Sequence, residues 1–440
     1  MERYDRYRDS GVEWIGEIPE HWSCSEISFY TCSRNGATPK RDHLEYWNGD
    51  IPWMASGEVS QGVVLDTKES ITVLGLNNSS TELMPIGTVM IALNGQGKTK
   101  GTPAILGIAS AFNQSLAAFV CDETHLHNRW LYYSFVAMYD YLRGEGTQAQ
   151  RDGISTASLK KERICLPTYT IQLVFSDYLD RKVSEIENLI RKTEKSIELL
   201  QDYRKSVISE AVTKGLDPNV PMKDSGIEWI GEIPEWWDLP KLKLLTTKIG
   251  SGKTPKGGAM TYSNSGVLFL RSQNVYNEGL VLDDAVFIDV NVDDEMSNTR
   301  VYRNDVLLNI TGGSIGRSSL YELDLPANVN QHVCIIRPSS EVLPSFIHYY
   351  WISELGSQII SLYQTGANRE GLNFEQIGNA VVPFPTLPEQ EKIVEYLNQK
   401  TSEIDSLIEK KKQLVEKLQE YRKSLISECV TGKVKVPGVE

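Results

Sequence analysis

Two sets of basic and amide side chains stand out because their types could hold a nucleic acid. Lysine and arginine bind phosphate oxygens, and arginine, asparagine or glutamine can hydrogen-bond base edges in pairs. Between residues 248 and 281, four cations accompany a single acid, Glu278. The candidate DNA-binding residues of the first set are Lys40, Arg41, Asn94, Gln96, Lys98, Lys100, Gln114, Gln148, Gln150 and Arg151. Those of the second set are Lys253, Lys256, Arg271, Gln273, Asn274, Asn309, Arg317, Gln331, Asn368 and Arg369.

Other chemistries are less well supported by the residue patterns. Residues 92–99 fit a loose phosphate-loop string, but residues 100–103 (KGTP) break the helix that must follow it. The His125 and His127 pair has metal-ligand spacing without a matching Cys/His cluster. Residues 66–68 (DTK) are only a fragment of a nuclease-like site. These patterns predict a non-catalytic chain with no metal site and no cofactor of its own.

Composition limits the class of protein. The chain has 440 residues, enough for two to three domains, and a formal charge of −13. A DNA-facing surface must therefore be a local basic patch on an acidic body. We expect no membrane span, because no apolar run reaches about 18 residues. Six scattered cysteines without a CxxC pair, and a charged N-terminus, predict reduced thiols and a cytoplasmic location.

An internal repeat determines the expected architecture. Residues 9–22 (DSGVEWIGEIPEHW) and 224–237 (DSGIEWIGEIPEWW) agree at twelve of fourteen positions. Residues 203–213 and 421–431 (YRKSLISECVT) agree at nine of eleven positions, at nearly the same offset. The chain is thus a tandem duplication. Between the matched blocks the halves have diverged, so we expect one common frame that presents two different surfaces.

Each half is predicted to contain a leader, a mixed α/β domain and a long helix. β-rich runs at 87–93 and 305–310 lie between Gly, Asn and Ser clusters, and helical stretches follow at 128–142 and 344–364. In the leader, Trp14, Ile15 and Ile18 are interpreted as structural anchors. The predicted domains are 1–166, the leader with the first α/β domain; 167–215, the central helix; 216–384, the leader with the second α/β domain; and 385–440, the C-terminal helix.

The two long helices carry apolar residues at alternating spacings of three and four, as in a coiled coil. We expect them to pair antiparallel, because a helix with so wide an apolar stripe needs a partner. Capping-box patterns at 184–187 and 402–405 suggest that each helix restarts or kinks there. The predicted stripe consists of Ile186, Leu189, Leu200, Tyr203, Val207, Ile404, Leu407, Leu414, Leu418, Tyr421 and Leu425.

The order of these motifs resembles the specificity subunits of type I restriction–modification systems. The leaders, the Thr-Pro-Lys at 38–40 and 254–256, residues 385–391 (PTLPEQE) and the twin Tyr-Arg-Lys-Ser helices carry the resemblance, which covers essentially the whole chain. It implies an α+β fold with two target-recognition domains in pseudo-two-fold arrangement, separated by a coiled-coil spacer. The first copy has residues 170–173 (TIQL) in place of Pro-Glu-Gln, which leaves the start of its helix open.

The resemblance further implies a bipartite double-stranded DNA site and two kinds of partner. These are two methyltransferase subunits and the restriction (motor) subunits, on which S-adenosylmethionine, ATP and Mg would be bound. Helices of about 30 residues would span about 45 Å, compared with about 34–36 Å for one DNA turn. The alternatives are a coiled-coil adaptor without DNA recognition and a fused DNA-modifying enzyme or lone nucleotidase. Matched polar loops within two divergent domains favour the specificity subunit.

Overall fold

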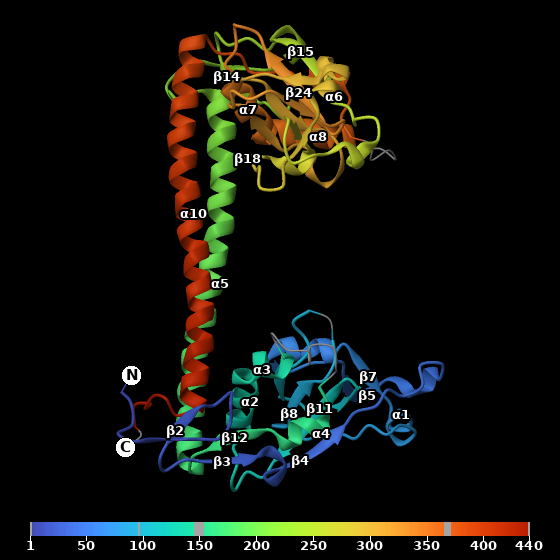
Figure 1. Cartoon of the computed structure of the whole chain (residues 1–440), viewed down its shortest axis with the longest axis vertical. Helices are drawn as coiled ribbons and strands as arrows, with labels where there is room; N and C mark the ends of the chain where they lie inside the picture. Colours follow the sequence, from blue (N-terminus) through green and yellow to red (C-terminus); the bar gives the residue numbers. More distant parts are fainter. Residues whose placement is uncertain (1, 96, 145–153, 365–370, 439–440) are drawn as a thin grey trace. The chain divides into compact units, whose positions relative to one another are not determined.

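The computed structural model of the chain describes residues 2–95, 97–144, 154–364 and 371–438. It divides into two units (Figure 1). The first unit comprises residues 1–193 and 413–440, and the second comprises residues 194–412. Each unit therefore contains one mixed α/β domain, together with a segment of each long helix.

In the first unit, two larger sheets form the centre of the mixed α/β domain, and β3 and β12 pair with each other separately. One larger sheet has the strand order β10-β5-β7 and the other β4-β11-β8-β9-β6. The strands are β3 (Ser23–Glu26), β4 (Thr31–Asn35), β5 (Trp47–Met54), β6 (Val63–Val64), β7 (Glu69–Ile71), β8 (Val89–Ala92), β9 (Pro103–Leu106), β10 (Ala111–Phe112), β11 (Leu116–Cys121) and β12 (Arg163–Leu166). The helices are α1 (Val73–Asn77), α2 (Asn128–Ala137), α3 (Tyr139–Arg143) and α4 (Thr156–Lys161).

The second unit repeats this plan. Its sheets have the orders β19-β16-β23-β20 and β15-β24-β21-β22. The strands are β15 (Thr246–Ser251), β16 (Val267–Leu270), β17 (Val275–Tyr276), β18 (Gly279–Leu280), β19 (Val286–Ile288), β20 (Arg300–Val301), β21 (Val306–Asn309), β22 (Ser318–Leu320), β23 (Ala327–Val329) and β24 (Val333–Pro338). The helices are α6 (Val290–Glu295), α7 (Pro344–Ile352), α8 (Glu354–Gln364) and α9 (Phe374–Gly378).

The predicted β-rich runs and helical stretches are confirmed. Strands β8 and β21 are buried along their whole length, which explains why residues 89–92 and 306–308 are continuous apolar runs instead of alternating ones. The stretch expected at 128–142 is two helices, α2 and α3, and the stretch at 344–364 is α7 followed by α8. The mixed α/β fold of both halves is as expected.

The two long helices are α5 (Tyr169–Lys214) and α10 (Leu387–Val430), and both are continuous. The expected restart near 184 and 402 is therefore wrong: apolar packing on both sides of these positions keeps the helix intact. Buried Gln172 and Gln390 fix the two starts equivalently, since each amide donates to the preceding proline carbonyl, of Pro167 or Pro385. Among the described residues, no helix is long and apolar enough to cross a membrane.

Within each unit, segments of α5 and α10 pack against each other in antiparallel orientation. In the first unit Arg422 donates to Glu187 at 2.9 Å, and in the second Arg204 lies 2.9 Å from Asp405. These are equivalent pairs, because Glu187 corresponds to Asp405 and Arg204 to Arg422 in the repeat. Each ion pair thus joins an acid of one copy to an arginine of the other.

The buried seam is narrower than the predicted stripe. Ile186, Val207, Ile404 and Leu425 are buried as expected, and Leu200 and Leu418 are half-buried. Five predicted members are instead exposed, because two helices cannot cover so wide an apolar face. They are Leu189, Tyr203, Leu407, Leu414 and Tyr421. Neighbouring Ile208, Ile408, Val415 and Ile426 complete the seam.

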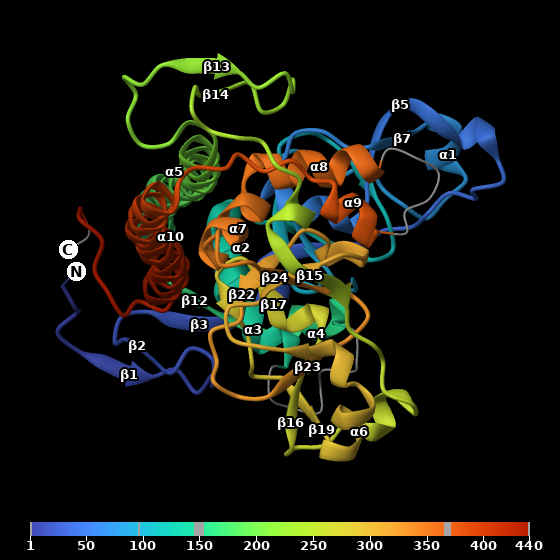
Figure 2. The same ribbon diagram turned by 90° about the horizontal axis from the view of Figure 1, so that it is seen from above.

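The repeated leader folds as a hairpin that packs against the end of a long helix. Strands β1 (Tyr7–Asp9) and β2 (Glu17–Pro19) form the first hairpin, and β13 (Met222–Asp224) and β14 (Glu232–Pro234) form the second, which follows α5 (Figure 2). Ile15 and Ile18 are buried and Trp14 is half-buried, in line with the structural interpretation. A Cβ on Gly432, just after α10, would lie 2.9 Å from the Trp22 ring.

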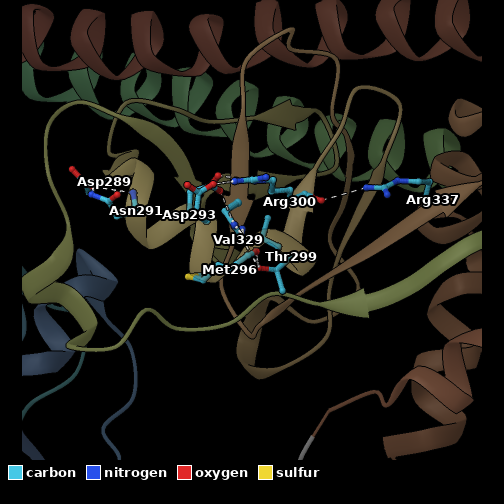
Figure 3. Close-up of polar contacts among 10 residues, drawn as sticks. Asp289, Asn291, Asp293, Met296, Thr299, Arg300, Val329 and Arg337 are labelled. Atoms are coloured by element: carbon cyan, nitrogen blue, oxygen red, sulfur yellow. Dashed lines mark hydrogen bonds and ion pairs between the residues drawn. The ribbon is translucent and has the colours of Figure 1, made fainter.

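A buried polar network holds β23 in the second unit. Arg300 donates to Asp293 at 2.7 Å, and Asn328 of β23 donates to the other oxygen of this carboxylate at 2.9 Å (Figure 3). Thr299 completes the network by donating to Asn328 at 2.6 Å. Buried charges require such partners, because desolvation of a lone carboxylate is costly. The network therefore fixes the strand that leads into Asn330 and Gln331.

Candidate DNA interface

Two loops that contact each other form the centre of the candidate site, and both units contain the same pair of loops. The TPK loop is residues 36–40 in the first unit and 252–256 in the second. The NQ turn is residues 113–115 and 330–332. Thr38 donates its hydroxyl to the Gln114 side-chain carbonyl at 2.5 Å, and Thr254 makes the same bond to Gln331. The structure therefore brings together the Thr-Pro-Lys and Asn-Gln pairs that matched in the sequence.

A third segment, the glycine loop, joins this site. It follows β8 at residues 94–95 and 97–102 and follows β21 at residues 311–317. Leu93 N–H donates to the Ser115 carbonyl at 2.8 Å, and Ile310 N–H donates to the His332 carbonyl at 3.0 Å. Ile154 and Leu372 then donate to the carbonyls of Leu93 and Ile310. The same hydrogen bonds thus gather the same loops in both units.

We call this assembly the loop cluster: the TPK loop, the NQ turn and the glycine loop of one unit. The predicted residues it exposes are Lys40, Asn94, Lys98, Gln114, Lys253, Lys256 and Gln331. Lys100 and Arg317 belong to it and are half-buried. The glycine loop of the first unit is followed by strand β9 and not by a helix, so it has no helix N-terminus with which to cradle a phosphate.

Two predicted residues are corrected. Asn274 and Asn309 have no exposed surface and use their amides inside the domain. Asn274 donates to the Val281 carbonyl and to Asp284, and Asn309 donates to the Ser272 carbonyl. An asparagine side chain can satisfy backbone groups as readily as it contacts a ligand, and here the first role applies. Six further candidates lie outside the described residues: Gln96, Gln148, Gln150, Arg151, Asn368 and Arg369.

Aromatic side chains beside the predicted arginines were missed. The Arg41 guanidinium lies 3.9 Å from the Trp47 ring centroid and also pairs with Glu69. This contact lowers the pKa of Glu69, whose carboxylate the guanidinium stabilises. Arg317 lies over Tyr276 at 4.4 Å. In the second unit Arg271 also lies 5.9 Å from the Tyr262 ring centroid. Trp47 and Tyr262 follow the two TPK loops at similar distances in sequence, and this spacing is the signal that could have indicated aromatic support.

The second unit arranges its arginine differently. Arg271 donates to the Asp284 carbonyl at 2.6 Å, and Gln273 donates to the side chain of the same residue. Arg271 is thereby held against its own domain, whereas Lys253 and Lys256 are exposed. Both units thus combine exposed cations with restrained, planar donors, which are the groups that contact phosphates and base edges. Their detailed surfaces differ.

His125 and His127 do not form a joint site. His125 contacts Asp122 and Thr124, while His127 faces Ser176 at 3.3 Å. Within the described part of the chain, no three His, Cys, Asp or Glu side chains gather where they could hold one metal ion.

Comparison with known proteins identifies the family to which this architecture belongs. The family model described as "Type I restriction modification DNA specificity domain" matches residues 20–199 and again 234–417. The chain belongs to this family. The two matches cover most of both halves and agree with the internal repeat. It is thus a DNA specificity subunit, a non-catalytic component of a type I restriction–modification system.

Relatives resemble this specificity subunit over most or nearly all of its length. The MjaVIII specificity subunit of Methanocaldococcus jannaschii is 25% identical over 429 residues, covering 95% of this chain and 94% of the relative. The EcoBI specificity subunit of Escherichia coli is 21% identical, with 73% and 69% covered. Among solved structures, a chain of a type I R-M system aligns with a TM-score of 0.69 at 14% identity, covering 95% and 99%. The HsdS subunit from Thermoanaerobacter tengcongensis gives 0.55 at 13% identity, covering 95% and 98%.

Proposed function

We propose that this specificity subunit recognises an asymmetric bipartite site on double-stranded DNA, with one half-site for each loop cluster. The supporting observation is that equivalent hydrogen bonds build both clusters while the side chains around them differ. Arg41 stacks on Trp47 in the first unit, whereas Arg317 stacks on Tyr276, from a different loop, in the second. Because the two clusters have the same backbone arrangement but different surrounding side chains, we expect them to recognise different base sequences.

The subunit is further proposed to scaffold two methyltransferase subunits and the restriction subunits. S-adenosylmethionine, ATP and Mg would then be bound by those partners. Net acidity of −13 is compatible with DNA binding if the partners contribute part of the phosphate-neutralising charge. The cytoplasm, where DNA and such partners meet, is the proposed location.

Helix geometry supports a docking place for the methyltransferases in each unit. Glu187 and Leu189 lie on opposite flanks of seam residue Ile186, because successive residues rotate by about 100° around a helix. Arg422 and Tyr421 likewise flank Leu425. Since the Glu187–Arg422 pair joins one flank of α5 to one flank of α10, Leu189 and Tyr421 share the opposite side.

That opposite side faces away from the recognition domain. Lys423, beside Arg422, pairs with Asp140 of α3, so the ion-pair side contacts the domain. Leu189 is 46% exposed and Tyr421 is 50% exposed. The second unit repeats this arrangement with Leu407 and Tyr203, 44% and 53% exposed. Each unit therefore has one exposed leucine–tyrosine pair. Two equivalent pairs would allow two copies of the same partner to bind, each through an apolar helix face.

Mapping of methylated adenine across a genome, with and without this gene and its partners, tests the proposal. One bipartite motif with unlike halves should disappear with the gene. Exchanging residues 23–165 for the same segment of a relative should alter one half-site and leave the other unchanged. An adaptor without DNA recognition would alter no motif in either experiment, and a change in both half-sites would contradict independent domains.

A further inference from the structure

The TPK loop is built onto the neighbouring strand in the same way in both units. A Cβ on Gly252 would lie 1.7 Å from the Val329 carbonyl oxygen, and one on Gly36 would lie 2.2 Å from that of Asn113. Only glycine allows this approach. The next residue donates its N–H to the strand: Ala37 to Phe112 at 3.0 Å, and Lys253 to Val329 at 3.1 Å. The loop position is therefore fixed by backbone contacts.

The prolines and lysines of the loop also have equivalent environments. Pro39 and Pro255 are both buried, so each anchors the residue that follows it. Lys40 is exposed, and the Lys256 side chain is 95% exposed, with its ammonium 3.7 Å from Glu295. A cation with this exposure gains little from a surface acid. Each unit thus holds one lysine outward at the same place on a rigid loop.

The NQ turn presents an oriented amide beside that lysine. Asn113 accepts the Ser115 N–H and Asn330 accepts the His332 N–H, both at 3.1 Å, so the turn is closed by the same bond. The threonine of the TPK loop then binds the glutamine carbonyl. With its oxygen engaged, the glutamine directs its NH2 group to other partners. In the second unit one such partner is His332 at 3.0 Å.

The residues of the TPK loop and the NQ turn that are identical in the two units have neighbours that differ between the units. Position 37 is alanine where position 253 is lysine, and position 115 is serine where position 332 is histidine. If the two half-sites differ in sequence, residues shared by both units must contact something common to both half-sites. Every duplex shares its phosphate backbone, which is bound by lysine and by amide donors without sequence information.

We propose that the TPK loop and NQ turn form, in each unit, a sequence-independent seat for the DNA backbone. Lys40 and Lys256 pair with phosphates, and the amides of Gln114 and Gln331 donate to phosphate oxygens. Thr38 and Thr254 are positioning residues that orient those amides. This inference rests on the proposed bipartite recognition, and assigns base discrimination to the divergent neighbours of the seat.

The test uses the full chain in complex with its methyltransferase partners. Lys40→Ala and Lys256→Ala are compared for DNA affinity over a range of salt concentrations and for their methylation motif. Each should reduce the slope of log K against log salt by about one and weaken binding roughly three- to tenfold. The methylated motif should be unchanged in both half-sites. Lys392→Ala and Lys412→Ala, exposed lysines on α10, are matched charge controls and should alter neither quantity.

The positioning residues are tested separately. Thr38→Val and Thr254→Val should weaken DNA binding without altering the methylated motif. Thr38→Ser and Thr254→Ser should keep the affinity of the unmodified complex, because the hydroxyl is retained. A changed base preference in any of these variants would overturn the inference, as would an unchanged affinity and salt slope in the lysine variants. Failure of the proposed function would appear instead in the unmodified complex, as the absence of a bipartite methylation motif.

Discussion

At the scale of single residues, side chains of the same type have different roles. Lys40 and Lys256 are exposed, whereas Arg41 and Arg271 are held by Glu69 and Asp284 of their own domains. A restrained, stacked guanidinium loses less conformational freedom on binding than a free one. The restrained arginines next to divergent loops are thus better suited to base recognition, and the exposed lysines to phosphate contact.

We predict that replacement of Arg41 or Arg317 by alanine affects one half-site each. If the side chain recognises a base, the expected cost is about 1–3 kcal/mol of binding free energy, with relaxed sequence preference in that half-site only. Methylation mapping and binding to the mapped duplex measure both effects. Arg41→Lys is the matched control: it keeps the charge but loses the planar stack on Trp47. Uniform weakening on all sequences would instead indicate a phosphate contact.

The same expectation holds for Arg151 and Arg369, which occupy matching sequence positions before an acid and a glycine. Each is predicted to face DNA in its own half-site. Alanine variants should relax one half-site each, at about 1–3 kcal/mol. A reduced salt slope with unchanged motif would reassign the residue to phosphate contact, and no effect in either assay would mean a structural role.

His348 provides a residue-scale prediction for stability. Burial, followed by the nearby Arg204 charge, lowers the pKa of His348 to about 4. The unfolded chain binds this proton near pH 6.5, so its stabilising effect is complete above that pH and is lost as the pH falls toward 4. Between pH 7 and 5 we expect a loss of about 1–2 kcal/mol from this group.

Denaturant unfolding at pH 7 and pH 5 would measure this loss. In His348→Gln the side chain cannot titrate, so the difference in unfolding free energy between the two pH values should shrink by that amount. The Ser318 hydroxyl, 3.3 Å from the His348 ring nitrogen, can still bond to the amide. Parallel pH profiles in the two proteins would show that His348 is not the group responsible.

At the scale of elements, spacing in the sequence located the helices better than it located their buried faces. The periodic pattern predicted α5 and α10 and their antiparallel pairing, because a long apolar stripe requires a partner. It could not separate Ile186, which is buried, from Leu189, which is exposed. Both residues fit a three-four spacing, and only the position of the opposing helix decides which is covered.

The recognition loops show the same limit. The Thr-Pro-Lys and Asn-Gln segments that match in the two halves are the segments that the structure places in contact, through Thr38–Gln114 and Thr254–Gln331. Asn309, however, lies in an equally polar stretch and is buried. Its role depends on the Ser272 carbonyl, 37 residues away in sequence, with which it bonds. Likewise, the sequence shows an aromatic residue shortly after the TPK loop, but only the folded chain shows that the Trp47 ring lies against Arg41.

The exposed Leu–Tyr pairs lead to a prediction about assembly. Leu189→Asp should remove one of the two methyltransferase subunits, because a carboxylate would be buried at the proposed docking face. Leu189→Asp with Leu407→Asp should remove both. Light scattering or native mass spectrometry of the purified complex would report the number of subunits bound. Leu189→Met with Leu407→Met keeps the apolar surface and should retain both. Full assembly of the double aspartate variant would contradict docking at this face.

At the scale of the whole molecule, each unit combines parts of both copies of the repeat. The first unit contains the leader of the first copy and the end of α10 from the second. Trp22 lies against Gly432, and Trp237 lies against Gly215 in the equivalent contact of the second unit. The N-terminus and C-terminus also meet in the first unit, where Lys435 N–H donates to the Glu2 carbonyl at 2.8 Å. The first copy is therefore incomplete without the second.

This exchange of parts predicts how residues 1–215 behave alone. Without α10, the seam residues Ile186, Val207 and Ile208 are exposed to water, and the leader loses the helix end against which it packs. A second copy can replace both contacts, since Val207 and Ile208 correspond to Leu425 and Ile426. The fragment should form a dimer with a true two-fold axis. With methyltransferase partners it should methylate a palindrome made from the first half-site twice.

Charge reversal would show whether such a dimer uses the helix pairing of the intact chain. In the dimer, Glu187 of one copy should face Arg204 of the other twice, replacing the Glu187–Arg422 and Arg204–Asp405 pairs. Glu187→Arg should therefore weaken the dimer, because two arginines would oppose each other, and Glu187→Arg with Arg204→Glu should restore it. Sedimentation at micromolar concentration and adenine mapping measure assembly and specificity. A folded monomer at that concentration would contradict the model, because the apolar seam of α5 would then have to be covered within a single copy.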